Sequence, residues 1–119
     1  MNDFPDFMRN PKNRIHATSD FVAGLEGYVF DGVDGSQIAF WTCRDDGVAA
    51  EHTHPFDEYM VIVQGRYTLC MGSKRIPLGP GDEYCIPKGV PHFGERIAGT
   101  RTIHAFGGKR AVRESEIKA

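Results

Sequence analysis

The sequence predicts an all-β domain, arranged as a sandwich or a barrel of short strands. Glycine and proline, with 14 and 7 residues, are spread along the chain and interrupt it roughly every eight to twelve residues. The segments between these breaks are rich in β-branched and aromatic residues and show almost no helical periodicity. A chain of 119 residues suffices for one hydrophobic core but not for two, so we expect one domain over residues 1–119.

Two strands are predicted in the first half of the chain. Residues 27–30 read Gly-Tyr-Val-Phe and end at an Asp-Gly pair, a common turn sequence. Residues 36–44 follow a second Asp-Gly pair and contain the run Ile-Ala-Phe-Trp-Thr-Cys, which favours a strand. Phe40 and Trp41 must then face opposite sides of the sheet, so that one fills the interior and the other covers the outside.

Further strands are predicted in the second half, at residues 58–63, 66–71, 75–78, 83–86 and 100–106. A Gln-Gly pair joins the first two of them, which indicates a β-hairpin. Because side chains alternate along a strand, Met60 and Ile62 should share the inward face with Glu58 and make the interior apolar.

The two ends of the chain are expected to lie outside the strands. Residues 1–20 form a predicted N-terminal arm, whose Phe4, Phe7 and Met8 could pack against the barrel or a partner subunit. Residues 109–119 form a predicted C-terminal tail with at most one or two helical turns. The basic residues of this tail alternate with acidic ones, which is typical of a solvated surface.

Composition and charge exclude several classes of function. The formal net charge of -2 argues against a surface that binds nucleic acid or an anionic membrane. The first residues show no secretory signal, and the longest apolar run, residues 59–63, is far too short to span a bilayer. We therefore expect a cytoplasmic protein, in which Cys43, Cys70 and Cys85 are small buried residues of strands.

Three of the five histidines and one glutamate form the most informative pattern. His52 and His54 are two residues apart, so on a strand both project from the same face. Glu58 opens the next predicted strand, and His92 follows a turn rich in proline and glycine. Three imidazoles and a carboxylate suit one divalent transition metal ion, such as Zn, Fe, Mn or Ni. Asp57, beside the glutamate, is instead expected to be a solvated loop acid.

The alternative is that these histidines are ordinary hydrogen-bonded residues near the end of a strand. An isolated His-x-His pair would favour that alternative. The addition of Glu58 and His92 favours a metal site, because ionisable groups inside a small barrel are costly unless they are paired or bind a metal.

The spacing of these residues resembles the first of two motifs of the cupin superfamily. That motif consists of a glycine, His-x-His, a glutamate and a second glycine, which correspond here to Gly47, His52, His54, Glu58 and Gly65. The loop between the first glycine and the first histidine is one residue shorter than the usual pattern.

A later stretch resembles the second cupin motif. Its glycine, Pro-x-Gly, histidine and final asparagine correspond here to Gly81, Pro87, Gly89, His92 and Arg96. The arginine replaces the asparagine of the family pattern, a position that lies outside the ligand set.

Together the two motifs cover residues 47–96. The resemblance implies a small cupin, that is, a double-stranded β-helix or jelly-roll barrel with a metal ion inside. The ligands that it implies, position by position, are His52, His54, Glu58 and His92. It also implies a small-molecule ligand in the barrel and a homodimer.

Residues around the metal would decide the chemistry. His104 shares a predicted strand face with Thr102 and Phe106, and could serve near the metal as a partner of a ligand or as a proton acceptor. The alternative for it is a hydrogen-bonded or surface histidine. Glu51 and Glu95 are the other candidate acid or base groups.

Three functions remain open at this point. The first is a metal-dependent enzyme, of the dioxygenase, isomerase or lyase type, that acts on a small oxygen-bearing molecule at open positions of the metal. The second is a non-catalytic module that binds a metal and a small molecule. In the third, the metal mainly stabilises the folded barrel. The enzyme is the function that we expect.

Overall fold

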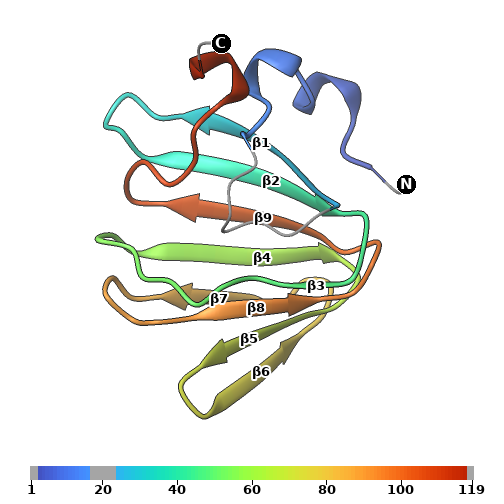
Figure 1. Ribbon diagram of the computed structural model, residues 1–119, viewed down its shortest axis with the longest axis vertical. Helices are drawn as coiled ribbons and strands as arrows, with labels where there is room; N and C mark the ends of the chain where they lie inside the picture. Colours follow the sequence, from blue (N-terminus) through green and yellow to red (C-terminus); the bar gives the residue numbers. More distant parts are fainter. Residues whose placement is uncertain (1–2, 17–23, 118–119) are drawn as a thin grey trace.

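The computed structural model describes residues 3–16 and 24–117 (Figure 1). Its strands are β1 (Leu25–Asp31), β2 (Gln37–Cys43), β3 (Gly47–Val48), β4 (Glu58–Gln64), β5 (Tyr67–Met71), β6 (Lys74–Leu78), β7 (Glu83–Ile86), β8 (Phe93–Arg96) and β9 (Arg101–Phe106). Its helices are three short 3-10 turns, η1 (Asp6–Met8), η2 (Pro11–Asn13) and η3 (Glu114–Glu116). Within the described residues, no helix is long and apolar enough to cross a membrane.

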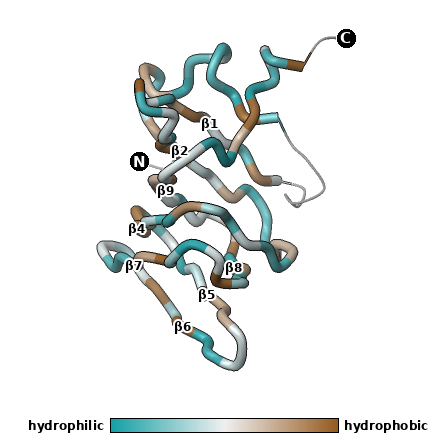
Figure 2. The backbone as a smooth tube through the Cα atoms, turned by 90° about the vertical axis from the view of Figure 1, so that its left-hand side faces the viewer, coloured by the Kyte–Doolittle hydropathy of each residue, from teal (hydrophilic) through white to brown (hydrophobic). Residues whose placement is uncertain are grey.

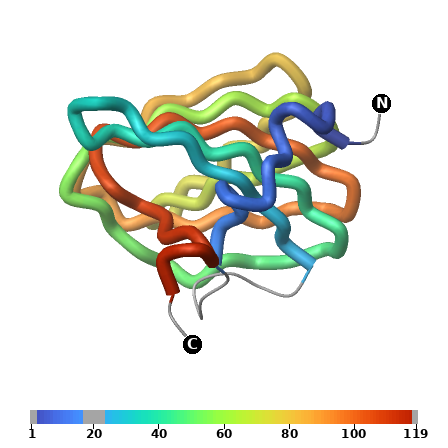
Figure 3. The backbone as a smooth tube through the Cα atoms, turned by 90° about the horizontal axis from the view of Figure 1, so that it is seen from above, coloured from blue at the N-terminus to red at the C-terminus, as the bar shows by residue number. Residues whose placement is uncertain are grey.

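The strands form two antiparallel sheets that enclose a common interior. The larger sheet has the order β1-β2-β9-β4-β7, and the smaller one has the order β3-β8-β5-β6. Seen from above, the strands surround the interior in a closed oval (Figure 3). Short hydrophobic stretches alternate with hydrophilic ones along the tube, as expected where one face of each strand meets water (Figure 2). The predicted all-β jelly-roll barrel is therefore confirmed.

The predicted strands match the observed ones closely, with one correction that concerns the site. β7 has the predicted bounds. The hairpin predicted around the Gln-Gly pair does not form, because β4 belongs to the larger sheet and β5 to the smaller one. The chain passes between the two sheets at Gly65, whose φ of 87° favours glycine. The short strand β3 was not predicted, and β8 has no counterpart among the predicted strand ranges. His52 and His54 lie outside every named strand, in an extended segment that a single bridge between His52 and His92 attaches to the smaller sheet.

The inward face of β4 follows the predicted alternation. Glu58, Met60 and Ile62 are all buried, and they lie opposite Phe106, His104 and Thr102 of β9. Met60 and Ile62 pack in one hydrophobic cluster, together with Leu69, Leu78 and Ile86. A second cluster consists of Ile15, Val29, Ala39, Trp41, Phe106 and Ala111.

The described parts of the two chain ends lie side by side next to β1 (Figures 1 and 3). Ile15 pairs with Arg113 in an isolated bridge, and the backbone N–H of His16 donates to Val112 at 2.7 Å. The buried Gln37 amide holds the C-terminal segment, because its oxygen accepts from the backbone N–H groups of Arg110 and Ala111.

These contacts agree with one expectation about the chain ends, that the N-terminal arm packs on the barrel, and correct another. Phe4 is buried against the Phe40 ring at 5.5 Å, whereas Phe7 is 82% exposed. The tail is not simply solvated, since the side chain of Arg113 is only 14% exposed and pairs with Asp31 at 2.9 Å. The expected helical turn is η3, while residues 1–2 and 17–20 of the predicted arm and residues 118–119 lie outside the described part.

Two of the three cysteines are buried, as predicted, and one is not. Cys43 and Cys70 lie inside strands, but Cys85 is exposed on β7, because it faces away from the inward-pointing Ile86. Trp41 takes the inward position on β2, and its neighbour Phe40 lies on the outer side against Phe4.

Candidate metal centre

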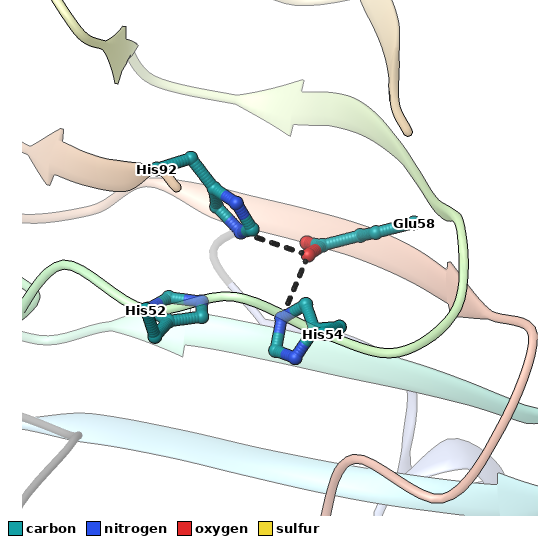
Figure 4. A group of neighbouring side chains, drawn as sticks. All are labelled: His52, His54, Glu58 and His92. Atoms are coloured by element: carbon teal, nitrogen blue, oxygen red, sulfur yellow. Dashed lines mark ion pairs between the residues drawn. The ribbon is translucent and has the colours of Figure 1, made fainter. Parts of the chain in front are cut away.

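The fold brings together the four residues that the sequence singled out. One ligand-type atom from each of His52, His54, Glu58 and His92 lies within 4.8 Å of the other three (Figure 4). The last three side chains are buried, and that of His52 is partly exposed. The cluster therefore lies just inside the barrel, with one member at its edge.

Backbone pairing explains how residues that are distant in sequence meet here. The peptide groups of His52 and His92 exchange two hydrogen bonds of 3.0 Å each. The carbonyl of His54 accepts a hydrogen bond from the N–H of Gly89 at 2.8 Å. Glu58 is the first residue of β4, in the larger sheet. The extended histidine segment thus bridges the two sheets at the place where the cluster forms.

The tautomers of two rings follow from their hydrogen bonds. Nδ1 of His52 lies 2.8 Å from the carbonyl oxygen of Ala50, and Nδ1 of His92 lies 2.9 Å from that of Val90. A carbonyl oxygen only accepts, so in both rings Nδ1 carries the proton. In the neutral ring Nε2 then presents a lone pair, which is the form that binds a metal.

Three polar atoms at the centre of the cluster are buried without a hydrogen-bond partner among the described residues: Nε2 of His54, Oε1 of Glu58 and Nε2 of His92. The glutamate oxygen lies 3.2 Å from the first nitrogen and 3.3 Å from the second. Buried polar atoms are rarely left unsatisfied. A cation among them would satisfy all three, so the donor set and its geometry fit a divalent metal ion.

The other oxygen of Glu58 is held by His104. Nδ1 of His104 lies 2.6 Å from Oε2, and its Nε2 lies 3.0 Å from the hydroxyl of Thr102. A carboxylate oxygen accepts, so Nδ1 is the donor and Nε2 of the neutral ring accepts from the threonine. This series of hydrogen bonds orients the carboxylate of Glu58, so that its other oxygen, Oε1, faces His54 and His92.

Burial and neighbouring rings shift the protonation of the cluster. Burial favours the neutral acid of Glu58, but the His104, His54 and His92 rings outweigh it and hold its pKa far below the usual range. Burial lowers the pKa of His52. For His92, burial is outweighed by the Glu58 carboxylate and the Val90 carbonyl, which raise its pKa in the metal-free protein.

A cavity of about 60 Å³ adjoins the cluster. Its walls are formed by Leu25, Trp41, Cys43, Ala49, His52, Glu58, Tyr67, His92, Arg96, Thr102, His104, Phe106 and Arg110. At roughly 10–15 Å³ per water-sized group, such a volume holds about four to six groups. The cavity thus suits a small ligand, and its walls combine three of the candidate metal ligands, His52, Glu58 and His92, with apolar side chains.

Two further ionisable groups in this cavity remain protonated at neutral pH. Burial raises the pKa of the Cys43 thiol to about 11. Burial, with the nearby Glu58 charge, raises the pKa of Tyr67 well above its usual value. Both side chains are therefore available as hydrogen-bond donors, and neither acts as a base near pH 7.

Several candidate residues lie elsewhere. Glu95 pairs with Arg75 at 2.5 Å on the outside of the smaller sheet, and Glu51 is exposed; neither lines the cavity. Asp57 is an exposed loop acid, as predicted, whose carboxylate accepts from the N–H of Lys88. Met60 and Ile62, although buried, do not line the cavity, which leaves its apolar walls to other residues.

Among the polar residues of the cavity wall, sequence reasoning did not place Tyr67, Arg96 and Arg110 at the site. Alternation from Leu69, an inward-facing residue of β5, would have placed Tyr67 inside. The replacement of the motif asparagine by Arg96 was the other available signal. Nothing local marked Arg110, since only the tertiary structure brings the C-terminal segment to the cavity.

Comparison with known families decides the classification. The profile of the Cupin domain family matches residues 39–106, more than half of the chain, and this range contains all four clustered residues. The chain belongs to the cupin family. No curated protein matches it in sequence closely enough to count as a relative.

Solved structures of other cupins share this fold. KdgF from Halomonas sp. has a TM-score of 0.68 at 20% identity, and the match covers 80% of this chain and 88% of that one. An RmlC-like cupin from Shewanella frigidimarina has a TM-score of 0.66 at 18% identity, with 82% and 86% covered. The polyketide cyclase RemF from Streptomyces resistomycificus has a TM-score of 0.62 at 18% identity, with 71% and 65% covered. At these identities the likeness establishes the fold alone.

Proposed function

We propose that this cupin binds one divalent transition metal ion through His52, His54, Glu58 and His92 and acts as an enzyme on a small oxygen-bearing molecule. The observation that carries the proposal is the set of buried, unpartnered nitrogen and oxygen atoms that face one another at 3.2 and 3.3 Å. In His52 and His92, Nδ1 donates to a backbone carbonyl, which leaves the lone pair of Nε2 free to bind a metal.

The residues around the cluster have roles that fit this proposal. A bound divalent metal would polarise an oxygen atom of the ligand as a Lewis acid, the chemistry shared by dioxygenase, isomerase and lyase sites of this type. His104 fixes the carboxylate of Glu58. Trp41 and Phe106 make the cavity wall apolar, and the protonated Tyr67 can donate to a ligand oxygen. The fold itself supports enzymatic chemistry in the cyclase RemF.

A non-catalytic metal-binding and small-molecule-binding module is the second candidate. It is favoured because no described residue of the cavity wall offers a free carboxylate or imidazole as a base. The one carboxylate on the wall is the candidate ligand Glu58, and His104, the imidazole outside the ligand set, is engaged by that carboxylate and by Thr102. Such a site binds a ligand without moving its protons.

Metal analysis of the protein purified without added metal tests the first part of the proposal. We expect about one Zn, Fe, Mn or Ni ion per chain, and loss of that ion in His92→Ala but not in the control His16→Ala, whose ring lies outside the cavity. Chelation should lower the melting temperature of the wild type. Absence of metal, with a melting temperature unaffected by chelator, would contradict the metal site.

Turnover separates the two candidate functions. The metal-loaded protein and His92→Ala are assayed side by side against diketones, sugars and aromatic diols. Turnover that depends on His92 supports the enzyme. Saturable binding of such a compound without turnover supports the binding module instead.

A further inference from the structure

Arg96, the last residue of β8, carries a buried positive charge into the cavity. Its relative exposure is only 7%, and it lines the same cavity as Glu58 and His92. Its Nε and Nη2 atoms are buried and have no hydrogen-bond partner in the described part of the chain. The second cupin motif carries asparagine at this position, so the charge departs from the family pattern.

The two unpartnered nitrogens lie on the same edge of the guanidinium group. Nε–H and the N–H of Nη2 that is parallel to it form a two-donor fork, whose spacing matches the two oxygens of a carboxylate. A lysine in this place would present a single point charge without that fork. The atoms left free are therefore the ones that would recognise a planar anion.

No other described group on the cavity wall neutralises this charge. Glu58 is the only carboxylate there, and its two oxygens face His104 on one side and His54 with His92 on the other. Cys43 and Tyr67 are neutral at pH 7, because burial raises the pKa of each. An unpaired buried charge is costly, which indicates that a bound anion compensates it in the working protein.

We propose that Arg96 binds the carboxylate of a small organic acid. A further oxygen atom of this acid, beside the carboxylate, points toward the cluster of His52, His54, Glu58 and His92. The inference rests on the proposed function only for the metal contact; the carboxylate contact is independent of it. The cavity volume of about 60 Å³ limits the acid to a few non-hydrogen atoms. The apolar walls at Leu25, Trp41 and Phe106 favour an organic acid over inorganic phosphate.

Binding of lactate, acetate and inorganic phosphate to the wild type, Arg96→Lys and Arg96→Met tests the proposal. Each is titrated into metal-free and Co²⁺-loaded protein by calorimetry, and the visible spectrum of Co²⁺ reports contact with the metal. Lactate, which has a hydroxyl beside its carboxylate, should bind more tightly than acetate and perturb the Co²⁺ spectrum. We expect Arg96→Met to weaken lactate binding by roughly 10- to 100-fold, with Arg96→Lys in between.

Thermal stability separates a binding role from a structural one. Because Arg96 is unpaired, Arg96→Met should unfold at the same temperature as the ligand-free wild type or higher. Arg75→Met is the matched control: Arg75 lies outside the cavity and pairs with Glu95, so its loss should leave lactate affinity unchanged. A large fall in the melting temperature of Arg96→Met, with lactate affinity retained in Arg96→Lys, would show that the guanidinium serves the fold instead.

The outcomes distinguish this inference from the metal proposal. Lactate binding that depends on Arg96, in a protein that takes up no Co²⁺, supports the inference and overturns the metal site alone. Uptake of Co²⁺ without any Arg96-dependent binding of lactate or acetate overturns the inference alone. Preference for phosphate over lactate in an Arg96-dependent manner would overturn the assignment to an organic acid.

Discussion

The two carboxylate oxygens of Glu58 have different partners and therefore different roles. Oε2 accepts from His104 at 2.6 Å, and Oε1 lies among the nitrogens of His54 and His92. The hydrogen bond to Oε2 fixes the direction of Oε1, in the way that partners of metal ligands commonly orient them. His104 is thus best described as a positioning residue for the proposed metal site.

Replacement of His104 by alanine should weaken metal binding without abolishing it. We expect the affinity for Zn²⁺ to fall by about 10- to 100-fold, because Glu58 loses the bond that orients it. Competition with a chromophoric chelator measures the affinity, with His16→Ala as the control. Unchanged Zn²⁺ affinity in His104→Ala would show that the carboxylate needs no such support.

In the smaller sheet, a glycine on β8 leaves the space that a tyrosine ring of β5 occupies at the cavity wall. β5 and β8 pair so that Gly94 lies beside Leu69, and the Tyr67 ring passes over the glycine. A Cβ atom at residue 94 would lie 1.9 Å from the hydroxyl oxygen of Tyr67. The absence of a side chain on β8 therefore decides where a cavity residue of β5 can lie.

Gly94→Ala should destabilise the fold by about 1–3 kcal/mol, since the tyrosine ring must shift within a packed interior. Urea denaturation measures the change. Gly79→Ala is the matched control, because the nearest atom to its new Cβ would be 3.9 Å away. Combining Gly94→Ala with Tyr67→Leu should recover part of the lost stability; a double variant less stable than Gly94→Ala would contradict this account.

Protonation of the clustered residues makes the stability of the whole fold depend on pH. The raised pKa of His92 means that its proton stabilises the metal-free fold fully below the ordinary value of 6.5, and that this contribution is lost as pH rises through the folded-state pKa. Glu58 behaves oppositely: its lowered pKa contributes stability above the ordinary 4.5, which is lost as pH falls. Together, His92 and Glu58 therefore favour the metal-free fold most between these two values.

A metal ion must displace the proton of His92, so its effect should have the opposite pH dependence. We expect the rise in melting temperature caused by Zn²⁺ to be largest above pH 7 and to disappear toward pH 5. Thermal unfolding with and without Zn²⁺ across this range measures it. A metal-induced rise that stays constant from pH 8 to pH 5 would contradict competition between proton and metal.

The sequence alone was sufficient for the fold class, most strands and the four clustered residues. These features depend on local patterns: alternation placed Glu58, Met60 and Ile62 on one inward face, and the spacing of the two motifs identified the histidines. His52 and His54 do not lie on a continuous strand: only His52 is paired, in its isolated bridge to His92, and Pro55 directly follows His54.

Only the tertiary structure decided which other residues surround the site. From the sequence, either Phe40 or Trp41 could face the interior. In the structure Trp41 is buried inside, and Phe40 packs against Phe4 on the other side of β2. His104 could have been a surface residue until its distance to Glu58 was known. Arg96 and Glu95 are adjacent charges, of which one faces the cavity and the other pairs outside. Such distinctions depend on contacts between strands far apart in sequence, which local patterns do not encode.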